Sequence, residues 1–243
     1  MQRFLRPDGV IRIRARYGGL FSLRIDQYIE GVVIDEGYYE SEVFEALRPW
    51  FTPGAVFWDI GANIGLHAIS AALLYPSIET HAFEPSSETF QRLQHHIDGN
   101  QVRVRAWPIA LGDTDCAGTL HLATDENCGR CTVVPSSDTA GWPTLSIQIS
   151  RADTLVANGE LPAPTIVKLD VEGSEPAVLR GFGALLHSPS LRAVVFESSA
   201  DLPLSPAECP SACQLLGAGF ELRALARQEN TAHPLGNFLA FRP

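Results

Sequence analysis

Residues 55–65, with the sequence AVFWDIGANIG, are the stretch that decides the fold of this chain. The stretch begins as a continuous apolar run, which is typical of a strand buried on both faces, and it ends in a glycine-rich turn. Leu66, Ile69 and Leu73 follow at helical spacing. A buried strand, a tight turn and a helix form the repeating unit of a parallel, doubly wound sheet.

The same unit recurs along the chain. Further strand-like runs are IETHAF (78–83), VRVRAW (102–107), TIVKLD (165–170) and LRAVVFE (191–197), with apolar helical stripes after the first and third of them. The last two runs, GFELRAL (219–225) and NFLAFRP (237–243), have no helix between them. The sequence therefore predicts an α/β fold with a doubly wound, mostly parallel sheet and an antiparallel hairpin at one edge.

Two other regions differ from this rhythm. Residues 10–16 and 20–26 read as strands around Gly18-Gly19, and residues 37–50 carry apolar side chains at helical spacing. We expect residues 1–50 to form a small β-hairpin and helix that pack on a domain of residues 51–243. Within that domain, residues 112–150 predict two strands that flank a polar loop at 124–144.

Composition limits the function. The formal charge of −10 argues against nucleic acid or an anionic membrane as a partner, because both require a basic face. No apolar leader or membrane-spanning run is visible, and five cysteines, an odd number, fit reduced thiols. We expect a cytoplasmic globular protein, and a homodimer is compatible with the sequence.

Polar residues gather where the first two strands of the doubly wound sheet end. Asp59 and the turn residues Gly61, Asn63 and Gly65 follow the first strand, and Glu84 ends the next one. A carboxylate at the position of Glu84 can accept hydrogen bonds from both hydroxyls of a ribose. The third glycine of the dinucleotide pattern G-x-G-x-x-G falls at Leu66, and the two carboxylates disfavour a diphosphate. The pattern favours an adenosine-bearing ligand that is cationic or zwitterionic.

Lys168 is the one lysine among the 18 lysine and arginine residues of the chain. It lies in a buried strand two residues before Asp170, so both side chains point to the same face. Glu172 follows as the strand opens into a turn. A buried ammonium group is costly unless carboxylates compensate it, so these residues predict a polar network at the end of the strand. A structural ion pair between strand and helix is the alternative.

DIGANIG (59–65), FEP (83–85), ALGD (110–113) and KLDVEGSE (168–175) resemble the motifs of the FkbM-like family of class I S-adenosylmethionine-dependent methyltransferases. The resemblance spans about residues 36–198. It implies a seven-stranded Rossmann-like sheet, S-adenosylmethionine as cofactor, and methyl transfer, usually onto hydroxyl oxygens of sugars or secondary metabolites.

The resemblance also implies roles for single residues. Asp59, Gly61, Asn63 and Gly65 would border the methionine part of the cofactor, Glu84 would hold its ribose, and Asp113 would lie near its adenine. His67 either contacts the cofactor or simply packs in the core.

Deprotonation of an alcohol during methyl transfer is helped by a nearby base. Asp170 is the first candidate for this base, with Lys168 tuning it or serving as the base, and with Glu172 beside them. Glu175 and Glu197 would complete an acidic rim. We expect no metal, since Lys168 already offsets part of the charge that a magnesium ion on Asp170, Glu172 and Glu197 would neutralise. Zinc thiolates from Cys128, Cys131, Cys209 and Cys213 are disfavoured by their spacing.

Several alternatives stay open. The methyl acceptor could be a nitrogen or a carboxylate of a small molecule or peptide. A nicotinamide-dependent oxidoreductase would use the same kind of sheet, and an adenosine-binding domain without catalytic activity would need fewer of these residues.

Overall fold

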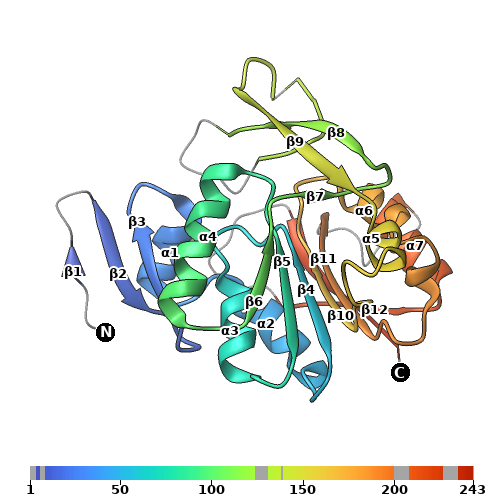
Figure 1. Ribbon diagram of the computed structural model, residues 1–243, viewed down its shortest axis with the longest axis horizontal. Coiled ribbons are helices and arrows are strands. Elements are labelled where there is room, and N and C mark those ends of the chain that lie inside the picture. The colour runs from blue at the N-terminus through green and yellow to red at the C-terminus, as the bar shows by residue number, and fades with distance from the viewer. Residues whose placement is uncertain are drawn as a thin grey trace.

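The protein is described by a computed structural model that covers residues 4–5, 9–123, 131–137, 139–199, 208–226 and 235–242. Its centre is a seven-stranded sheet with the order β12-β13-β11-β10-β4-β5-β6 (Figure 1). The strands are β4 Val56–Ile60, β5 Glu79–Phe83, β6 Val104–Trp107, β10 Ile166–Leu169, β11 Ala193–Ser199, β12 Glu221–Ala224 and β13 Leu235–Phe241.

All of these strands run parallel except β13, which is antiparallel to both β11 and β12. The predicted doubly wound sheet and its edge hairpin are therefore confirmed. The hairpin is arranged so that β13 lies inside the sheet and β12 forms the edge. From β4 the chain first adds β5 and β6 on one side and later adds β10 and β11 on the other, so the order of the strands reverses between β4 and β10. Open α/β sheets bind their ligands at such a switch point.

Helices cover both faces of the sheet (Figure 1). Successive residues of β10 alternate between two cores: Ile166 packs with α3 and α4, whereas Val167 packs with α5, α6 and α7. This explains why the strand is apolar at both positions. The helices are α3 Leu66–Leu74, α4 Ser87–Asn100, α5 Ala152–Ala157, α6 Glu175–Gly181 and α7 Pro210–Gly217, with a 3-10 helix at Gly183–His187.

The N-terminal part packs on the face of the sheet that carries α3 and α4, and it shares their hydrophobic core. It contains the hairpin that the sequence predicts and an additional short strand. Residues 37–50, expected to be one helix, instead contain a left-handed glycine, Gly37, and then a shorter helix; a further helix precedes them. The elements are β1 Phe4–Leu5, β2 Val10–Arg14, β3 Leu20–Arg24, α1 Tyr28–Glu36, α2 Ser41–Leu47 and a 3-10 helix at Arg48–Trp50.

Polar contacts with α4 anchor this N-terminal part. Arg92 donates to both carboxylate oxygens of Glu30, at 2.6 and 2.7 Å. Asn100 exchanges two hydrogen bonds with the backbone of Leu20, at 2.7 and 2.8 Å. His96 accepts from the Ser22 amide at 3.1 Å. Three side chains of one helix thus bind the hairpin and α1.

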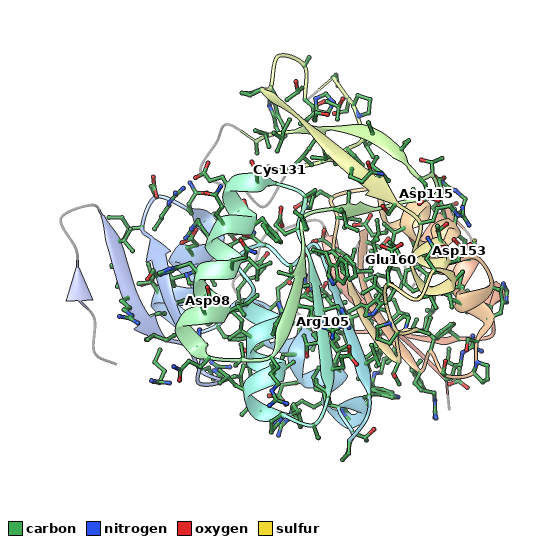
Figure 2. All side chains as sticks on the ribbon, viewed as in Figure 1. Asp98, Arg105, Asp115, Cys131, Asp153 and Glu160 are labelled. Carbon is green, nitrogen blue, oxygen red and sulfur yellow. The ribbon has the colours of Figure 1, made fainter. Side chains whose placement is uncertain are left out.

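The predicted strand pair within residues 112–150 is confirmed. β8 Cys116–His121 and β9 Thr144–Ser150 are antiparallel, and β7 Ala110–Leu111 pairs with β9. We call the described residues of 116–150 (116–123, 131–137 and 139–150) the β8–β9 arm; its two strands rise beyond the carboxyl ends of the central strands (Figure 1). At its base, Arg151 links Asp115 and Asp153, because its amide donates to Asp115 and its guanidinium binds Asp153. Figure 2 shows these two aspartates on the same side of the molecule.

Within the described part of the chain, no helix has the length and apolar character needed to cross a membrane.

The Glu30–Arg92 pair yields a first prediction. The Glu30 side chain is only 3% exposed, and the Glu30→Gln substitution leaves the Arg92 cation beside it without its counter-charge. The substitution should therefore lower the free energy of unfolding by about 3 kcal/mol. Urea denaturation measures this change. The exposed Arg24–Glu88 pair provides the control, and Glu88→Gln should cost less than about 1 kcal/mol. Equal effects of the two substitutions would contradict the anchoring role.

Candidate active site

A cavity of about 230 Å³ opens at the carboxyl ends of the central strands, next to the switch point. The glycine turn after β4 and the end of β10 form one part of its lining. The N-terminal part contributes Tyr28, Tyr39 and Glu40, and the β8–β9 arm contributes Leu120 and Cys131. Figure 2 shows Cys131 below β8 and β9. The cavity is therefore enclosed by three parts of the chain that are distant in sequence.

The glycine turn brings β4 and β10 into close contact. Gly61 has φ +78°, and a Cβ atom at this position would collide with the backbone carbonyl of Asp170. Gly65 has φ +90°, and a Cβ there would meet Leu93 of α4 at 2.5 Å. Both glycines are needed for backbone conformation and for close approach, as the sequence indicated.

Glu84 is held by the backbone at the end of β5. Its two carboxylate oxygens accept from the amides of Asn63 and Ser86, at 3.0 and 2.9 Å. Burial raises the pKa of Glu84 to about 7, against the opposing effect of these two hydrogen bonds. The carboxylate is thus oriented and 8% exposed on the same cavity as the glycine turn.

Lys168 lies between two aspartates. Its Nζ atom is 3.0 Å from Oδ2 of Asp170 and 3.8 Å from Oδ1 of Asp59, its register partner on β4. The other oxygen of Asp59 accepts from the Ala68 amide of α3 at 2.9 Å. Burial opposes the charge on Lys168, but Asp170, Asp59 and Glu40 outweigh it and raise its pKa above the ordinary value. Lys168 is therefore an ammonium ion at neutral pH, which argues against it as the base.

Glu40 is a site residue that sequence analysis missed. It lies between α1 and α2 with φ +52°, and its Oε1 atom accepts from Nδ2 of Asn237 on β13 at 2.9 Å. Burial and then the Asp170 carboxylate raise the pKa of Glu40 to about 7. A contact that spans 197 residues leaves no local signal in the sequence.

Glu172 and Glu197 line the cavity beside Asp170, as the acidic rim predicted. Burial, followed by the charges of Asp170, Glu172 and Glu40, raises the pKa of Glu197 to about 9. We call Glu40, Asp170, Glu172 and Glu197 the acidic wall. Glu175 differs, because its side chain accepts from the Val171 amide at 3.0 Å and does not line the cavity.

Three buried polar atoms on cavity-lining residues lack a hydrogen-bond partner in the described structure: Oε2 of Glu42, Nε2 of His67 and Oγ of Ser174. His67 is 6% exposed, and burial, followed by the charge of Lys168, lowers its pKa to about 3. A hydrogen bond to the Glu40 backbone opposes this shift. One nitrogen of a neutral imidazole ring donates and the other accepts, so Nε2 can take one of these two roles toward a ligand.

Asp113 lies apart from the other candidate residues. Its carboxylate binds Arg180 of α6, with distances of 2.7 and 2.9 Å, and it does not line the cavity. Ile109, Ala110 and Leu111, just before it, line the cavity on the side of Glu84. The Asp113 carboxylate therefore lies outside the cavity lining, and its place near an adenine stays a prediction.

No group of three histidine, cysteine, aspartate or glutamate side chains among the described residues is arranged to hold a metal ion. Cys128, one of the four cysteines weighed for zinc, lies outside these residues.

Substitution of Gly61 tests the contact between β4 and β10. Gly61→Ala combines a left-handed backbone with a collision at the Asp170 carbonyl, so it should destabilise the protein by at least about 2 kcal/mol. Gly99→Ala in α4 is the matched control, since its Cβ would meet nothing within 4 Å; it should be neutral or stabilise by about 0.5 kcal/mol. Thermal unfolding compares the two, and a harmless Gly61→Ala would refute the close contact.

Solved structures with a similar fold include M. jannaschii TYW2 in complex with AdoMet. It has a TM-score of 0.50 and 13% sequence identity, and the match covers 96% of this chain and 84% of that one. P. horikoshii TYW2 in complex with MeSAdo matches with a TM-score of 0.50 and 14% identity over 96% of this chain and 70% of that one. These similarities concern the fold.

Two curated relatives are more similar in sequence. The hexuronic acid methyltransferase AglP of Haloferax volcanii is 30% identical over 162 residues, which cover 67% of this chain and 64% of the relative. The 31-O-demethyl-FK506 methyltransferase FkbM of Streptomyces tacrolimicus is 38% identical over 171 residues, which cover 60% of this chain and 65% of the relative. The chain thus spans just under two thirds of the length of these relatives.

The methyltransferase FkbM domain matches residues 59–203, which begin at Asp59 on β4 and end after Glu197. That region contains the turn, Glu84 and the Lys168–Asp170 pair, which agrees with the resemblance seen in the sequence. The chain belongs to the FkbM methyltransferase domain family.

Proposed function

We propose that the protein is an S-adenosylmethionine-dependent methyltransferase that methylates a hydroxyl group of a sugar or secondary metabolite. The observation that carries the proposal is the opening of three features into one cavity: the glycine turn, the oriented carboxylate of Glu84, and the Lys168–Asp170 ion pair. Family membership and the two methyltransferase relatives support it.

The lining fits the proposed cofactor. Glu84 has both oxygens on one buried carboxylate beside the cavity, which suits the two hydroxyls of a ribose. Gly61 and Gly65 keep the turn free of side chains, so the methionine part can lie against the backbone. Phe83, Pro85 and Ile109 offer apolar surface for an adenine. When bound, S-adenosylmethionine supplies a methyl group on a positively charged sulfur.

Asp170 acts as the base in this proposal. Its carboxylate is 29% exposed on the cavity side and is held by Lys168 at 3.0 Å. The acceptor hydroxyl gives its proton to this carboxylate as its oxygen gains the methyl group, and the proton later leaves to water. Lys168 is a positioning residue, because its ion pair fixes the Asp170 carboxylate. Glu172 lies beside Asp170 and contacts the acceptor.

The Asp170 carboxylate also bears on whether the acceptor is a hydroxyl, an amine or a carboxylate. An amine or a carboxylate acceptor would be a variant of the same chemistry, and the relative named for hexuronic acid shows that sugar acids occur as substrates of related proteins. A carboxylate placed to take a proton is of most use to an alcohol, which favours a hydroxyl. A nicotinamide-dependent oxidoreductase would bind NAD⁺, whereas the proposed enzyme should bind S-adenosylhomocysteine in calorimetry and leave NAD⁺ unbound.

Asp170→Asn tests the base. The amide keeps the size of the side chain but cannot take a proton, so the rate of methyl transfer should fall by a factor of about 10²–10⁴. The readout is a product heavier by one methylene group when protein, cofactor and a metabolite extract are mixed. The variant should still bind S-adenosylhomocysteine, and Asp98→Asn on the exposed face of α4 is the control for a general charge effect. Full activity in Asp170→Asn would exclude this role.

Glu84 makes cofactor binding depend on pH. Its pKa is raised to about 7 in the free protein, and ribose hydroxyls bind the ionised form better. Affinity for S-adenosylhomocysteine should therefore increase as the pH rises from 6 to 8, by at most about tenfold per unit below the pKa. Calorimetry at several pH values measures this increase. Glu84→Gln should weaken binding and flatten the dependence; an unchanged pH profile in this variant would place the ribose elsewhere.

A further inference from the structure

The charge of the cavity carries information about the acceptor. Among the described residues, Lys168 is the one lysine or arginine that lines it, and seven carboxylic acids do so: Glu36, Glu40, Glu42, Glu84, Asp170, Glu172 and Glu197. Lys168 is already bound to Asp170 and lies near Asp59. Its positive charge is therefore used within the protein, and the carboxyl groups of the acidic wall outnumber this one cation among the described lining residues.

The members of the acidic wall act on one another. Asp170 raises the pKa of both Glu40 and Glu197, and Glu172 and Glu40 add to the effect on Glu197. Tyr39 belongs to the same region, because burial and then the charges of Glu40, Asp170 and Glu197 raise its pKa. Carboxylates and an aromatic ring around one space are the groups that bind an ammonium ion.

The unpartnered atoms give independent support. Oε2 of Glu42 accepts when the carboxyl group is ionised, Nε2 of His67 belongs to a ring that is 6% exposed, and Oγ of Ser174, in a residue that is 4% exposed, can accept as well as donate. Buried polar atoms are normally hydrogen-bonded. A ligand rich in N–H and O–H donors would therefore satisfy groups that the protein leaves open, whereas an anionic group has no donor to offer to the Glu42 oxygen.

We propose that the acceptor is an amino alcohol or amino sugar, whose protonated amine binds Glu40 and Glu197 while a neighbouring hydroxyl is presented to Asp170. This inference rests on the proposed methyltransferase function and specifies its substrate class. It separates this protein from its relative named for hexuronic acid, because a sugar carboxylate placed against the acidic wall would face like charges.

Binding of arm-bearing cofactor analogues tests the inference without knowledge of the natural acceptor. In three analogues of S-adenosylhomocysteine, the sulfur is replaced by a nitrogen that carries a three-carbon arm ending in an ammonium, a hydroxyl or a carboxylate group. The arm extends from the position of the transferable methyl group toward the acceptor. The ammonium arm should bind at least tenfold more tightly than the hydroxyl arm, and the carboxylate arm should bind most weakly.

Substitutions test whether Glu40 and Glu197 cause the preference for the ammonium arm. The double substitution Glu40→Gln and Glu197→Gln should remove most of the advantage of the ammonium arm but leave the affinity for S-adenosylhomocysteine unchanged. Glutamine has the shape of the protonated carboxyl group, so the fold should tolerate it. Glu36→Gln, at an exposed residue that lines the cavity, is the matched control and should keep the order of the three arms.

The outcomes are distinct. Equal or tighter binding of the carboxylate arm to the wild-type protein would overturn the inference, as would an undiminished ammonium preference in the double variant. If that variant does not fold, the order of the three arms on the wild-type protein decides alone. If S-adenosylhomocysteine itself does not bind, the proposed function fails, and the acceptor class falls with it.

Discussion

The buried ammonium group of Lys168 is the constraint on which the site depends. A lysine that is 4% exposed at the end of a central strand is stable only if carboxylates surround it. The structure supplies Asp59 from the neighbouring strand, Asp170 from just after the end of the same strand, and Glu40 from the N-terminal part. The chain has 17 arginines, yet this position needs a compact point charge that fits between strands, and a planar guanidinium group does not meet that need.

This arrangement explains why the N-terminal part belongs to the site. Lys168 points to the face of the sheet that carries α3 and α4, and the hairpin with its two helices covers the same face. Glu40 lies in the break between α1 and α2, where Gly37 and Glu40 itself have left-handed backbone conformations. This break turns the chain so that Glu40 approaches Lys168. The Glu30–Arg92 ion pair therefore affects the cavity although it lies outside it. It fixes α1, and the chain that follows α1 carries Glu40 into the cavity.

Much of the fold could be predicted from sequence because it is encoded locally. Buried strands followed by helices predicted the sheet, and AVFWDIGANIG with FEP predicted the position of the glycine turn and of Glu84. Helix α1 was missed because YIEGVVIDE contains a glycine and β-branched residues, which favour other structures until packing overrides them. Glu40, Tyr39 and Asn237 could not be found as site residues, since long-range packing alone brings them to the cavity. Asp113 shows the opposite case, in which a sequence motif suggested a site residue that the cavity does not contain. The ALGD motif suggested Asp113, but its side chain binds Arg180 outside the cavity.

The hydrogen bond between Asn237 and Glu40 has a consequence for biosynthesis. The ribosome makes the glycine turn and Glu84 early, whereas β13 is the last strand of the sheet to be made. Until β13 inserts between β11 and β12, Glu40 lacks its partner and the acidic wall is not held in place. Because Gly236 and Asn237 of β13 line the cavity, a nascent chain acquires the complete cavity only after synthesis of that strand.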